Sequence, residues 1–405
     1  MRAPATPKGD PVIALVAGEE SGDQLGAAIM RALKARAGGR IRFVGVGGRE
    51  MACEGLRSPF DVGDLAIIGV VAIPRRLPLI LRRIRETAEL VVASRPDTLV
   101  IIDSPEFTHR VARRVRAEAP AIPIIDYVPP SVWAWRPGRA RAMRRYVDHV
   151  LALLPFEPQA LQQLGGPPST YVGHPLLERL GELRPSEAEA QRRLSEPPIV
   201  LALLGSRGSE LHRLSAIFGQ SLAMLATGRA PFEIVIPTLP QLKDQVTAAT
   251  AAWPLKPRIV VDAADKLAAF RTARAALTKS GTVTLELALA GIPMVAAYKV
   301  SWFDECVMRL ALRVPSAILA NLILGEIVVP EYLQRACTPP NLAAALAPLL
   351  TDTPERRRQL AAFARLDAIM RHDAPAAGMA HSPSEHAADV VLGAADGARG
   401  IKGTE

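Results

Sequence analysis

The sequence predicts an α/β protein with two Rossmann-like domains, each built on a mostly parallel sheet. Short apolar runs alternate with segments of helical periodicity, which is the pattern of βαβ units. The series stops at the polar stretch 181–198 and begins again at Ile199. The length of 405 residues also exceeds what one hydrophobic core usually serves, so two domains are expected.

The apolar runs give the expected strands in order. In the first series these are 12–17, 41–46, 98–103, 122–128 and 150–154, with a helix expected over 25–35. In the second series they are 199–204, 232–236, 258–261, 275–277 and 293–295. Near the end, the segment 382–385 has the form of a capping box that begins a helix, and Gly393 is expected to end it. We therefore expect residues 394–405 to form a disordered tail.

The composition indicates a large core, reduced thiols and an anionic partner. Apolar residues make up 49% of the chain, and the three cysteines and seven histidines show no metal-binding spacing, which favours a cytosolic setting without a metal. The N-terminus lacks the apolar core of a signal peptide, and no apolar run of about 18 residues could span a bilayer. The net charge of +9 favours a nucleic acid, a phosphorylated substrate or an acidic membrane surface as partner.

The segment 279–286, Lys-Ser-Gly-Thr-Val-Thr-Leu-Glu, predicts a strand end, a small-residue turn and a helix. The amides of Ser280, Gly281 and Thr282, with the positive end of the helix, suit a phosphate. Glu286 follows on the helix, where a carboxylate can accept hydrogen bonds from the two hydroxyls of a ribose. Together they indicate a nucleotide site, although Ser-Gly-Thr also begins many helices for capping reasons alone.

A second anion-binding turn is expected at 205–210, directly after the first strand of the second series. Its glycines permit close approach of the backbone, beside Ser206, and Arg207 can pair with a diphosphate through two hydrogen bonds. A cation here would stabilise the charge on a departing nucleoside diphosphate.

Carboxylates gather at the strand ends of the first series. Asp103 stands where a parallel strand ends, so it is a candidate general base, and a helix N-cap is an equally good interpretation. The turn 18–23 carries Glu19, Ser21 and Asp23, and it is expected to face the hydroxyls of an acceptor sugar. The alternative is an exposed acidic turn that caps a helix.

Two basic segments are rich in apolar or aromatic residues. In 66–85, leucines and isoleucines interleave with arginines, which suits a membrane interface or a buried helix with a basic outer face. In 131–136, Trp133 and Trp135 precede Arg136, a combination found at membrane interfaces and in nucleic-acid stacking. His174, in Gly-His-Pro, is interpreted either as a cleft residue or as part of a hinge.

At these segments the sequence resembles the lipid-A-disaccharide synthase family of inverting glycosyltransferases, over roughly residues 12–350. Eight segments occur in the family's order: Ala17-Gly18-Glu19-Glu20-Ser21-Gly22-Asp23, Gly45-Val46-Gly47-Gly48, Ser131-Val132-Trp133-Ala134-Trp135-Arg136, Leu153-Leu154-Pro155-Phe156-Glu157, Gly173-His174-Pro175, Gly205-Ser206-Arg207-Gly208, Ser280-Gly281-Thr282, and Asn321 with Val328-Val329-Pro330-Glu331. The Ser-Val-Trp-Ala-Trp-Arg string is the most distinctive of them.

The resemblance implies a GT-B fold, with two parallel sheets facing across a cleft and a C-terminal helix returning to the N-terminal domain. Residues 1–180 would form the acceptor and membrane-facing domain, 181–350 the UDP-sugar domain, and 351–393 helices that pack back on the first domain. The implied reaction joins UDP-2,3-diacylglucosamine to the 6-hydroxyl of 2,3-diacylglucosamine 1-phosphate, giving a β-1,6 tetraacyl disaccharide 1-phosphate and UDP. The implied setting is the cytoplasmic face of the inner membrane, with peripheral association, no cofactor and a possible oligomer.

The resemblance also implies roles for the candidate residues. Asp103 is the expected base, with Glu19 as an orienting group or rival. The expected nucleotide ligands are Ser206, Arg207, Ser280, Gly281, Thr282, Glu286 and Asn321. The expected acceptor or acyl contacts are Ser21, Asp23, Trp133, Trp135 and Arg136.

The chain departs from the family's usual residues at Leu204, Glu106, Thr108, Asp126 and Ala320. Because Asp103 and Asn321 remain, we expect the activity to be retained, with acceptor or acyl preference open at Glu106, Thr108 and Asp126. Two rival functions are another UDP-sugar enzyme of this fold, such as a UDP-N-acetylglucosamine epimerase, and a basic nucleic-acid-binding protein. The second rival ranks low because no nucleic-acid-binding module is recognisable.

Overall fold

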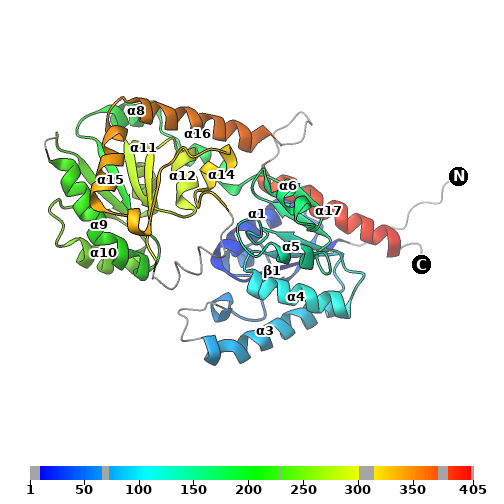
Figure 1. Cartoon of the computed structure of the whole chain (residues 1–405). Coiled ribbons are helices and arrows are strands. Elements are labelled where there is room, and N and C mark those ends of the chain that lie inside the picture. The colour runs from blue at the N-terminus through cyan, green and yellow to red at the C-terminus, as the bar shows by residue number, and fades with distance from the viewer. Residues whose placement is uncertain (1–9, 66–72, 228–229, 301–313, 373–381, 403–405) are drawn as a thin grey trace. The chain divides into compact units, whose positions relative to one another are not determined.

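The computed structural model describes residues 10–65, 73–227, 230–300, 314–372 and 382–402. It divides into two compact units, Met1–Leu177 with Asp373–Glu405, and Glu178–His372 (Figure 1). Each unit contains a parallel six-stranded sheet, so the predicted α/β fold is confirmed. Among the described residues, no helix is both long enough and apolar enough to cross a membrane.

Unit 1 holds its sheet in the order β2-β1-β3-β4-β5-β6. The strands are β1 Val12–Ala17, β2 Arg42–Val46, β3 Thr98–Ile102, β4 Ile124–Tyr127, β5 His149–Ala152 and β6 Ser169–Tyr171. The helices are α1 Glu20–Arg36, α2 Arg49–Cys53, α3 Ile73–Ser94, α4 Pro105–Glu118, α5 Gly138–Met143, α6 Glu157–Gln163 and α17 Pro383–Lys402, with short 3₁₀ turns at Val62–Leu65 and Pro175–Leu177. The central strands are apolar on both faces because helices cover both sides of the sheet.

Unit 2 repeats the plan with the strand order β12-β11-β10-β7-β8-β9. The strands are β7 Ile199–Leu203, β8 Glu233–Pro237, β9 Arg258–Val260, β10 Ala275–Lys279, β11 Met294–Tyr298 and β12 Glu331–Leu333. The helices are α7 Leu180–Leu183, α8 Glu187–Leu194, α9 Gly208–Ala226, α10 Lys243–Thr250, α11 Ala263–Thr272, α12 Val283–Leu289, α14 Leu319–Leu324, α15 Pro339–Leu346 and α16 Pro354–His372, with 3₁₀ turns at Pro240–Leu242, Gln334–Ala336 and Ala347–Leu350.

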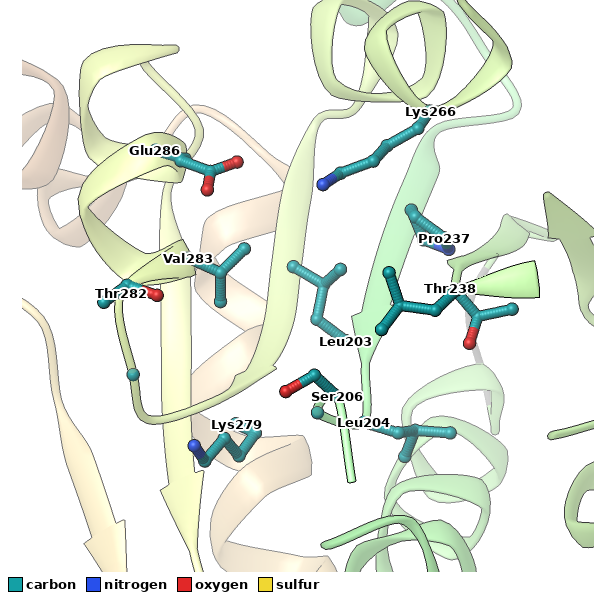
Figure 2. A pocket seen from close by; sticks show the side chains of 13 residues that line it. Leu203, Leu204, Ser206, Pro237, Thr238, Lys266, Lys279, Thr282, Val283 and Glu286 are labelled. Atoms are coloured by element: carbon teal, nitrogen blue, oxygen red, sulfur yellow. The ribbon is translucent and has the colours of Figure 1, made fainter. Parts of the chain in front are cut away.

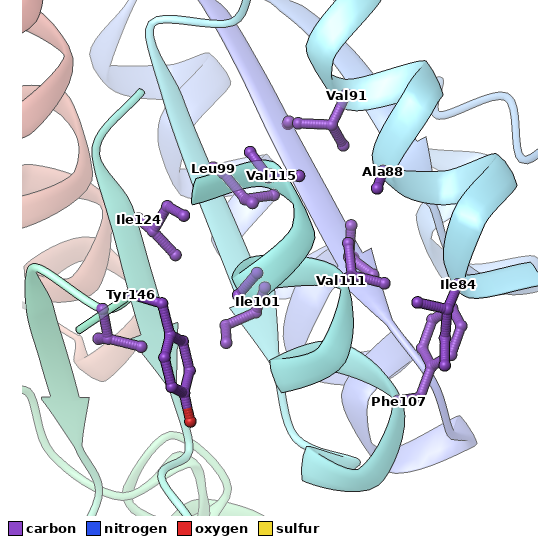
Figure 3. Close-up of a cluster of buried hydrophobic side chains, with 14 of the residues drawn as sticks. Ile84, Ala88, Val91, Leu99, Ile101, Phe107, Val111, Val115, Ile124 and Tyr146 are labelled. Atoms are coloured by element: carbon purple, nitrogen blue, oxygen red, sulfur yellow. The ribbon is translucent and has the colours of Figure 1, made fainter. Parts of the chain in front are cut away.

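Helices α3 and α4 close one face of the first sheet (Figure 3). Ile84, Ala88 and Val91 recur at helical spacing on α3, and they are buried in one cluster with residues of α4 and of strands β3 and β4. The same spacing leaves Arg82 and Arg85 on the outer side of α3, whereas Arg83 turns inward to stack on the Phe60 ring and pair with Asp64.

Helix α17 closes the other face of the first sheet, so the predicted return of the chain to the N-terminal domain is confirmed. It packs on α1, and Arg399 lies 3.2 Å from a carboxylate oxygen of Asp97, which also accepts a 3.0 Å hydrogen bond from the Val12 amide.

Two expectations about the C-terminal region are wrong. Helix α17 does not end at Gly393 but runs to Lys402, and it contains Gly393, Gly397 and Gly400. Val391, Ala395 and Ala398 continue its buried stripe, which offsets the cost of about 1 kcal/mol for each internal glycine. Helix α16 belongs to unit 2 and not, as expected for residues 351–393, to the N-terminal domain. The reason is Gln359, whose amide accepts from the Met294 N–H at 2.8 Å and donates to the Met294 carbonyl at 3.0 Å.

Buried arginines fasten helices to the second sheet. Arg274 donates to the carbonyls of Arg193, Ser195 and Leu350 at 2.8 to 3.1 Å, and it pairs with Glu196 at 2.6 Å. Arg193, in turn, donates to the carbonyls of Ala290 and Gly291, before β11, and of Phe270, in the last turn of α11, and burial lowers its pKa to about 10. Neutral carbonyl oxygens are the main acceptors for these two cations. Loss of either arginine side chain therefore leaves several buried carbonyl groups without a hydrogen-bond donor.

Replacing Arg274 with Met is expected to lower the free energy of unfolding of unit 2 by about 3 kcal/mol, because it leaves buried carbonyl groups without a hydrogen-bond donor. Chemical denaturation followed by circular dichroism measures the change. Arg358→Met is the matched control, since Arg358 is 63% exposed and pairs only loosely with Glu326 at 3.5 Å, a contact worth about 0–1 kcal/mol. Equal losses for the two variants would contradict the assignment.

Candidate functional site

A cavity of about 200 Å³ lies in unit 2, at the carboxyl ends of strands β7, β8 and β10 (Figure 2). Open parallel sheets bind ligands at this end, where loops and helix starts converge. The residues that line it are Leu203, Leu204, Gly205, Ser206, Pro237, Thr238, Leu239, Lys266, Lys279, Gly281, Thr282, Val283 and Glu286.

The turn after β10 supplies one wall of this cavity. Gly281 and Thr282 line it, and Thr282 precedes α12 without using its side chain as a cap. Ser280 is buried behind the wall, where its amide extends the sheet by donating to the Ala297 carbonyl at 2.9 Å. Glu286 lies one turn along α12 and also faces the cavity. Glu286 thus stands where the sequence expected a ribose ligand, beside a turn that leaves Gly281 and Thr282 accessible.

The turn after β7 supplies the opposite wall and is shaped by Gly205. Its φ is +104°, and a Cβ atom there would lie 2.3 Å from Glu210 Oε2, so a larger residue cannot fit. The same carboxylate oxygen accepts a 3.1 Å hydrogen bond from the Ser206 amide. Ser206 faces the cavity, whereas Arg207 is not among the described residues that line it. The Arg207 side chain is 77% exposed, with Glu210 3.8 Å away.

Two lysines that the sequence did not single out also line the cavity. Lys266 comes from α11, and Figure 2 shows its ammonium group pointing toward the Glu286 carboxylate. Lys279 is the last residue of β10, and its ammonium nitrogen lies 3.0 Å from Glu210 Oε1. Lys279 directly precedes the Ser-Gly-Thr turn, so its position in the motif was the available signal. A second cavity of about 130 Å³ shares Lys266 and Glu286 with the first.

Asn321 was expected to contact the nucleotide, but the structure gives its side chain another use. The amide oxygen accepts from the Val328 and Val329 amides at 3.0 and 2.9 Å. The amide nitrogen donates to the Val329 carbonyl at 2.9 Å and to the Ser316 hydroxyl at 3.1 Å. Asn321 is buried and is not among the described residues that line the cavity, so it acts by holding the loop that leads into β12.

In unit 1, Asp103 stands directly after β3 in a strained turn. Asp103 and Ser104 both have left-handed backbones, with φ of +51° and +47°, a conformation that costs non-glycine residues about 1–3 kcal/mol each. The Asp103 carboxylate accepts from the Ser104 amide at 2.7 Å and from the Ser21 hydroxyl at 2.8 Å. Gly18 makes room for the turn, because a Cβ atom there would lie 2.7 Å from the Ser104 hydroxyl oxygen.

The remaining residues of the acidic turn divide into accessible and buried ones. Glu19 and Ser21 are exposed around the start of α1. Asp23 is buried, and its carboxylate accepts from the amides of Gly48, Glu50 and Met51 at 2.7 to 3.0 Å. The expectation that Asp23 binds the acceptor is therefore wrong, because its oxygens hold the first turn of α2.

The aromatic segment 131–136 also divides. The Trp133 indole nitrogen donates to buried Glu157 at 3.0 Å, and its ring packs edge-on to Phe156, so Trp133 anchors the segment from inside. The Glu157 carboxylate also accepts from the Leu153 and Leu154 amides, and burial raises its pKa. Trp135 is 39% exposed, and the Arg136 guanidinium lies 4.3 Å from its ring centroid.

The departures in unit 1 serve internal contacts. Glu106 pairs with Arg139 at 2.8 Å, which ties α5, just after the aromatic segment, to the start of α4, just after Asp103. The Thr108 hydroxyl donates to the Asp103 carbonyl at 2.7 Å. Asp126 is buried in the core, with one carboxylate oxygen 3.2 Å from the His109 ring. Thr108 thus helps to hold the turn that carries Asp103, and Glu106 helps to hold the helix that follows Trp135.

His174 ends unit 1 in a compact turn. Its Nδ1 accepts a 3.2 Å hydrogen bond from the Leu176 amide, which requires a deprotonated nitrogen. Burial lowers the pKa of His174 to about 4. The ring is therefore neutral in the folded protein near pH 7, and its contact is with the local backbone.

Comparison with known proteins gives one family and one fold. A family model described as lipid-A-disaccharide synthetase matches residues 13–375. The lipid-A-disaccharide synthase of Nitrobacter hamburgensis is 60% identical over 388 residues, covering 96% of both chains. That of Rhodospirillum centenum is 40% identical, covering 94% of both.

Solved structures share the fold at low identity. A putative UDP-N-acetylglucosamine 2-epimerase from Listeria monocytogenes has a TM-score of 0.58 at 14% identity and covers 95% of both chains. MurG of Acinetobacter baumannii has a TM-score of 0.53 at 17% identity, covering 95% of this chain and 99% of that one. The architecture is thus that of GT-B glycosyltransferases and epimerases.

His174 is expected to make folding stability pH-dependent in a defined window. Its folded pKa of about 4 lies below the usual value of about 6.5, so stability is complete above pH 6.5 and is lost as pH falls toward 4. The slope of unfolding free energy against pH gives the number of protons taken up on unfolding. Across this range that number should be larger for wild type than for His174→Asn, by up to about one proton. His212→Asn, at an exposed position on α9, is the control and should keep the wild-type dependence. Identical profiles for wild type and His174→Asn would refute the assignment.

Proposed function

Because this chain belongs to the lipid-A-disaccharide synthetase family, we propose that Asp103 is its general base and that the cavity of unit 2 holds the nucleotide-sugar donor. The protein is a glycosyltransferase. It transfers 2,3-diacylglucosamine from UDP to the 6-hydroxyl of 2,3-diacylglucosamine 1-phosphate with inversion, giving the β-1,6 tetraacyl disaccharide 1-phosphate and UDP.

The observation that carries the role of Asp103 is its strained turn at the end of β3. Left-handed backbone at two successive non-glycine residues persists only where surrounding contacts enforce it, and such strain gathers at working sites. The Ser104 amide orients one carboxylate oxygen, while the second contacts only the exposed Ser21 hydroxyl among the described residues. That second oxygen is open to a substrate hydroxyl in a way that the oxygens of buried Asp23 are not.

Inversion is explained by one displacement. The acceptor 6-hydroxyl oxygen attacks the anomeric carbon as its proton passes to Asp103, and the bond from that carbon to the UDP oxygen breaks. The electron pair of that bond leaves with UDP. Glu19, exposed just before α1, is the rival base or an orienting group.

The donor half of the proposal rests on the shape and polarity of the unit 2 cavity. The diphosphate would lie against Ser206, Gly281 and Thr282, and Glu286 would accept hydrogen bonds from the ribose hydroxyls. Arg207 stands at the exposed end of the turn after β7, where its long side chain can reach the leaving diphosphate. Asn321 and Ser280 would support these contacts from behind.

The acceptor half rests on exposed groups near Asp103. Ser21 shares a hydrogen bond with the base, and the Glu106–Arg139 ion pair ties α5, just after the segment bearing Trp135 and Arg136, to the start of α4, just after Asp103. An indole face with a guanidinium stacked on it suits an acylated sugar that carries a phosphate.

Peripheral association with the inner membrane is proposed from the outer face of α3. Leu77 and Leu81 are 42% and 49% exposed, and the Arg82 and Arg85 side chains beside them are 65% and 57% exposed. Apolar side chains flanked by arginines suit a lipid interface that carries phosphates. Residues 66–72, the most apolar part of the segment, lie outside the described residues.

Asp103→Asn is expected to reduce turnover by about 100-fold or more, since an amide cannot accept the proton, while UDP affinity stays at the wild-type value. Turnover is measured as UDP release with both acylated substrates, and affinity by calorimetry. Asp244→Asn, at an exposed position on α10, is the matched control for the loss of a carboxylate. Near-normal turnover of Asp103→Asn would remove Asp103 from the role of base.

Replacing Leu77 and Leu81 together with Glu is expected to weaken binding to vesicles of phosphatidylglycerol and phosphatidylcholine by about tenfold or more, through lost apolar burial and added negative charge. Co-sedimentation measures the bound fraction. Met224→Glu, at a 47% exposed position on α9, is the control and should bind as wild type does. Unchanged binding of the double variant would show that the α3 face is not the lipid contact.

A further inference from the structure

The donor cavity contains a cation, Lys279, to which the sequence analysis assigned no role. Lys279 closes β10 directly before the Ser-Gly-Thr turn, and its side chain is 18% exposed and lines the cavity. Arg207, the cation expected there, is 77% exposed and is not among the described lining residues. In Figure 2, Lys279 lies at the opposite end of the cavity from Lys266.

The Lys279 ammonium group lies close to Glu210, Tyr298 and Gly281. Its nitrogen lies 3.0 Å from Glu210 Oε1 and 5.4 Å from the Tyr298 ring centroid. A Cβ atom at position 281 would lie 3.1 Å from the ammonium nitrogen. Because residue 281 is glycine, no side chain at that position covers the ammonium group. The position of the cation is thus fixed before any ligand arrives.

Glu210 links this cation to the second turn of the cavity. Its Oε1 faces Lys279, while its Oε2 accepts from the Ser206 amide at 3.1 Å. An ammonium group has three N–H donors, and among the described residues Glu210 is the only carboxylate that pairs with Lys279. Donors therefore remain for an anion in the cavity without breaking the Glu210 contact.

We propose that Lys279 is a further catalytic residue, which donates hydrogen bonds to the diphosphate of the bound donor and to the UDP that leaves. This rests on the proposed placement of the donor in the unit 2 cavity. The turn amides bind the phosphates as neutral dipoles, whereas Lys279 adds a full positive charge where negative charge accumulates as the glycosidic bond breaks. Glu210 is a positioning residue that aims this charge and the Ser206 amide at one point.

The test compares uridine, UMP and UDP as ligands of wild type and Lys279→Met, by calorimetry or competition. Loss of a charge-assisted hydrogen bond should weaken UDP binding by about 10–100-fold and leave uridine binding within about twofold. Turnover with both acylated substrates should fall as well, and Lys279→Arg should restore part of both. Lys243→Met, at an exposed position on α10 outside the cavity lining, is the matched control.

The double variant Lys279→Met with Glu210→Gln separates a ligand role from a structural one. It removes both charges, so Glu210 is no longer left unpaired, and the glutamine oxygen can still accept from Ser206. Persistent loss of UDP affinity in the double variant is the expected result. Recovery of UDP affinity, or equal loss for uridine and UDP in Lys279→Met, would make the lysine a structural partner and overturn the proposal. Failure of wild type itself to bind UDP would instead refute the donor site on which the proposal rests.

Discussion

Buried carboxylates that accept hydrogen bonds from backbone amides hold the working ends of both sheets in place. Asp23 fixes the start of α2, Glu157 fixes the loop after β5, and Glu210 fixes the turn after β7. Glu331, which is half-buried, accepts in the same way from the Ala317 and Ile318 amides before α14. Loops at strand ends contain amides that no strand or helix pairs, and an ionised side chain is a strong partner for them. The same kind of contact occurs at the proposed working residues. The Asp103 carboxylate accepts from the Ser104 amide, and the Glu210 carboxylate accepts from the Ser206 amide. Glu157 also holds Trp133, two residues before Trp135.

The fold was predictable from the sequence because most of its strands coincide with unbroken runs of apolar residues. Strands β3 and β7 are buried throughout, and β1 is buried at every residue except Val12. The unbroken apolar runs therefore marked the strands, and the change to helical spacing after each run located the turns. The end of α17 was not predictable from Gly393, because the buried stripe of Ala395 and Ala398 outweighed the three glycines within the helix. Helix α16 was misplaced because the Gln359 contact with Met294 joins residues 65 positions apart.

The candidate site was predictable where a residue type has one common use at a strand end. Gly281, Thr282 and Glu286 line the cavity as their motif indicated. Asp23 and Asn321 were assigned to substrates because a polar side chain in a motif looks the same whether it binds a ligand or its own backbone. Only the amides around them tell the two uses apart. Lys279 was passed over for the opposite reason, since a lysine at the end of a strand is commonly a solvent-exposed residue.

The chain leaves unit 1 at Leu177 and comes back to it at Asp373, so unit 2 is inserted within unit 1. During synthesis the ribosome makes both sheets before it makes α17, which supplies Ala387, Ala388 and Val391 to the core around β1 and β3. Unit 2 is continuous in sequence and can complete its core while the chain is still being elongated. The first domain to emerge is therefore the last to be finished, and the part of its sheet that α17 covers stays exposed until that helix is made. Nascent chains of this protein thus expose an apolar surface for chaperones through most of their synthesis.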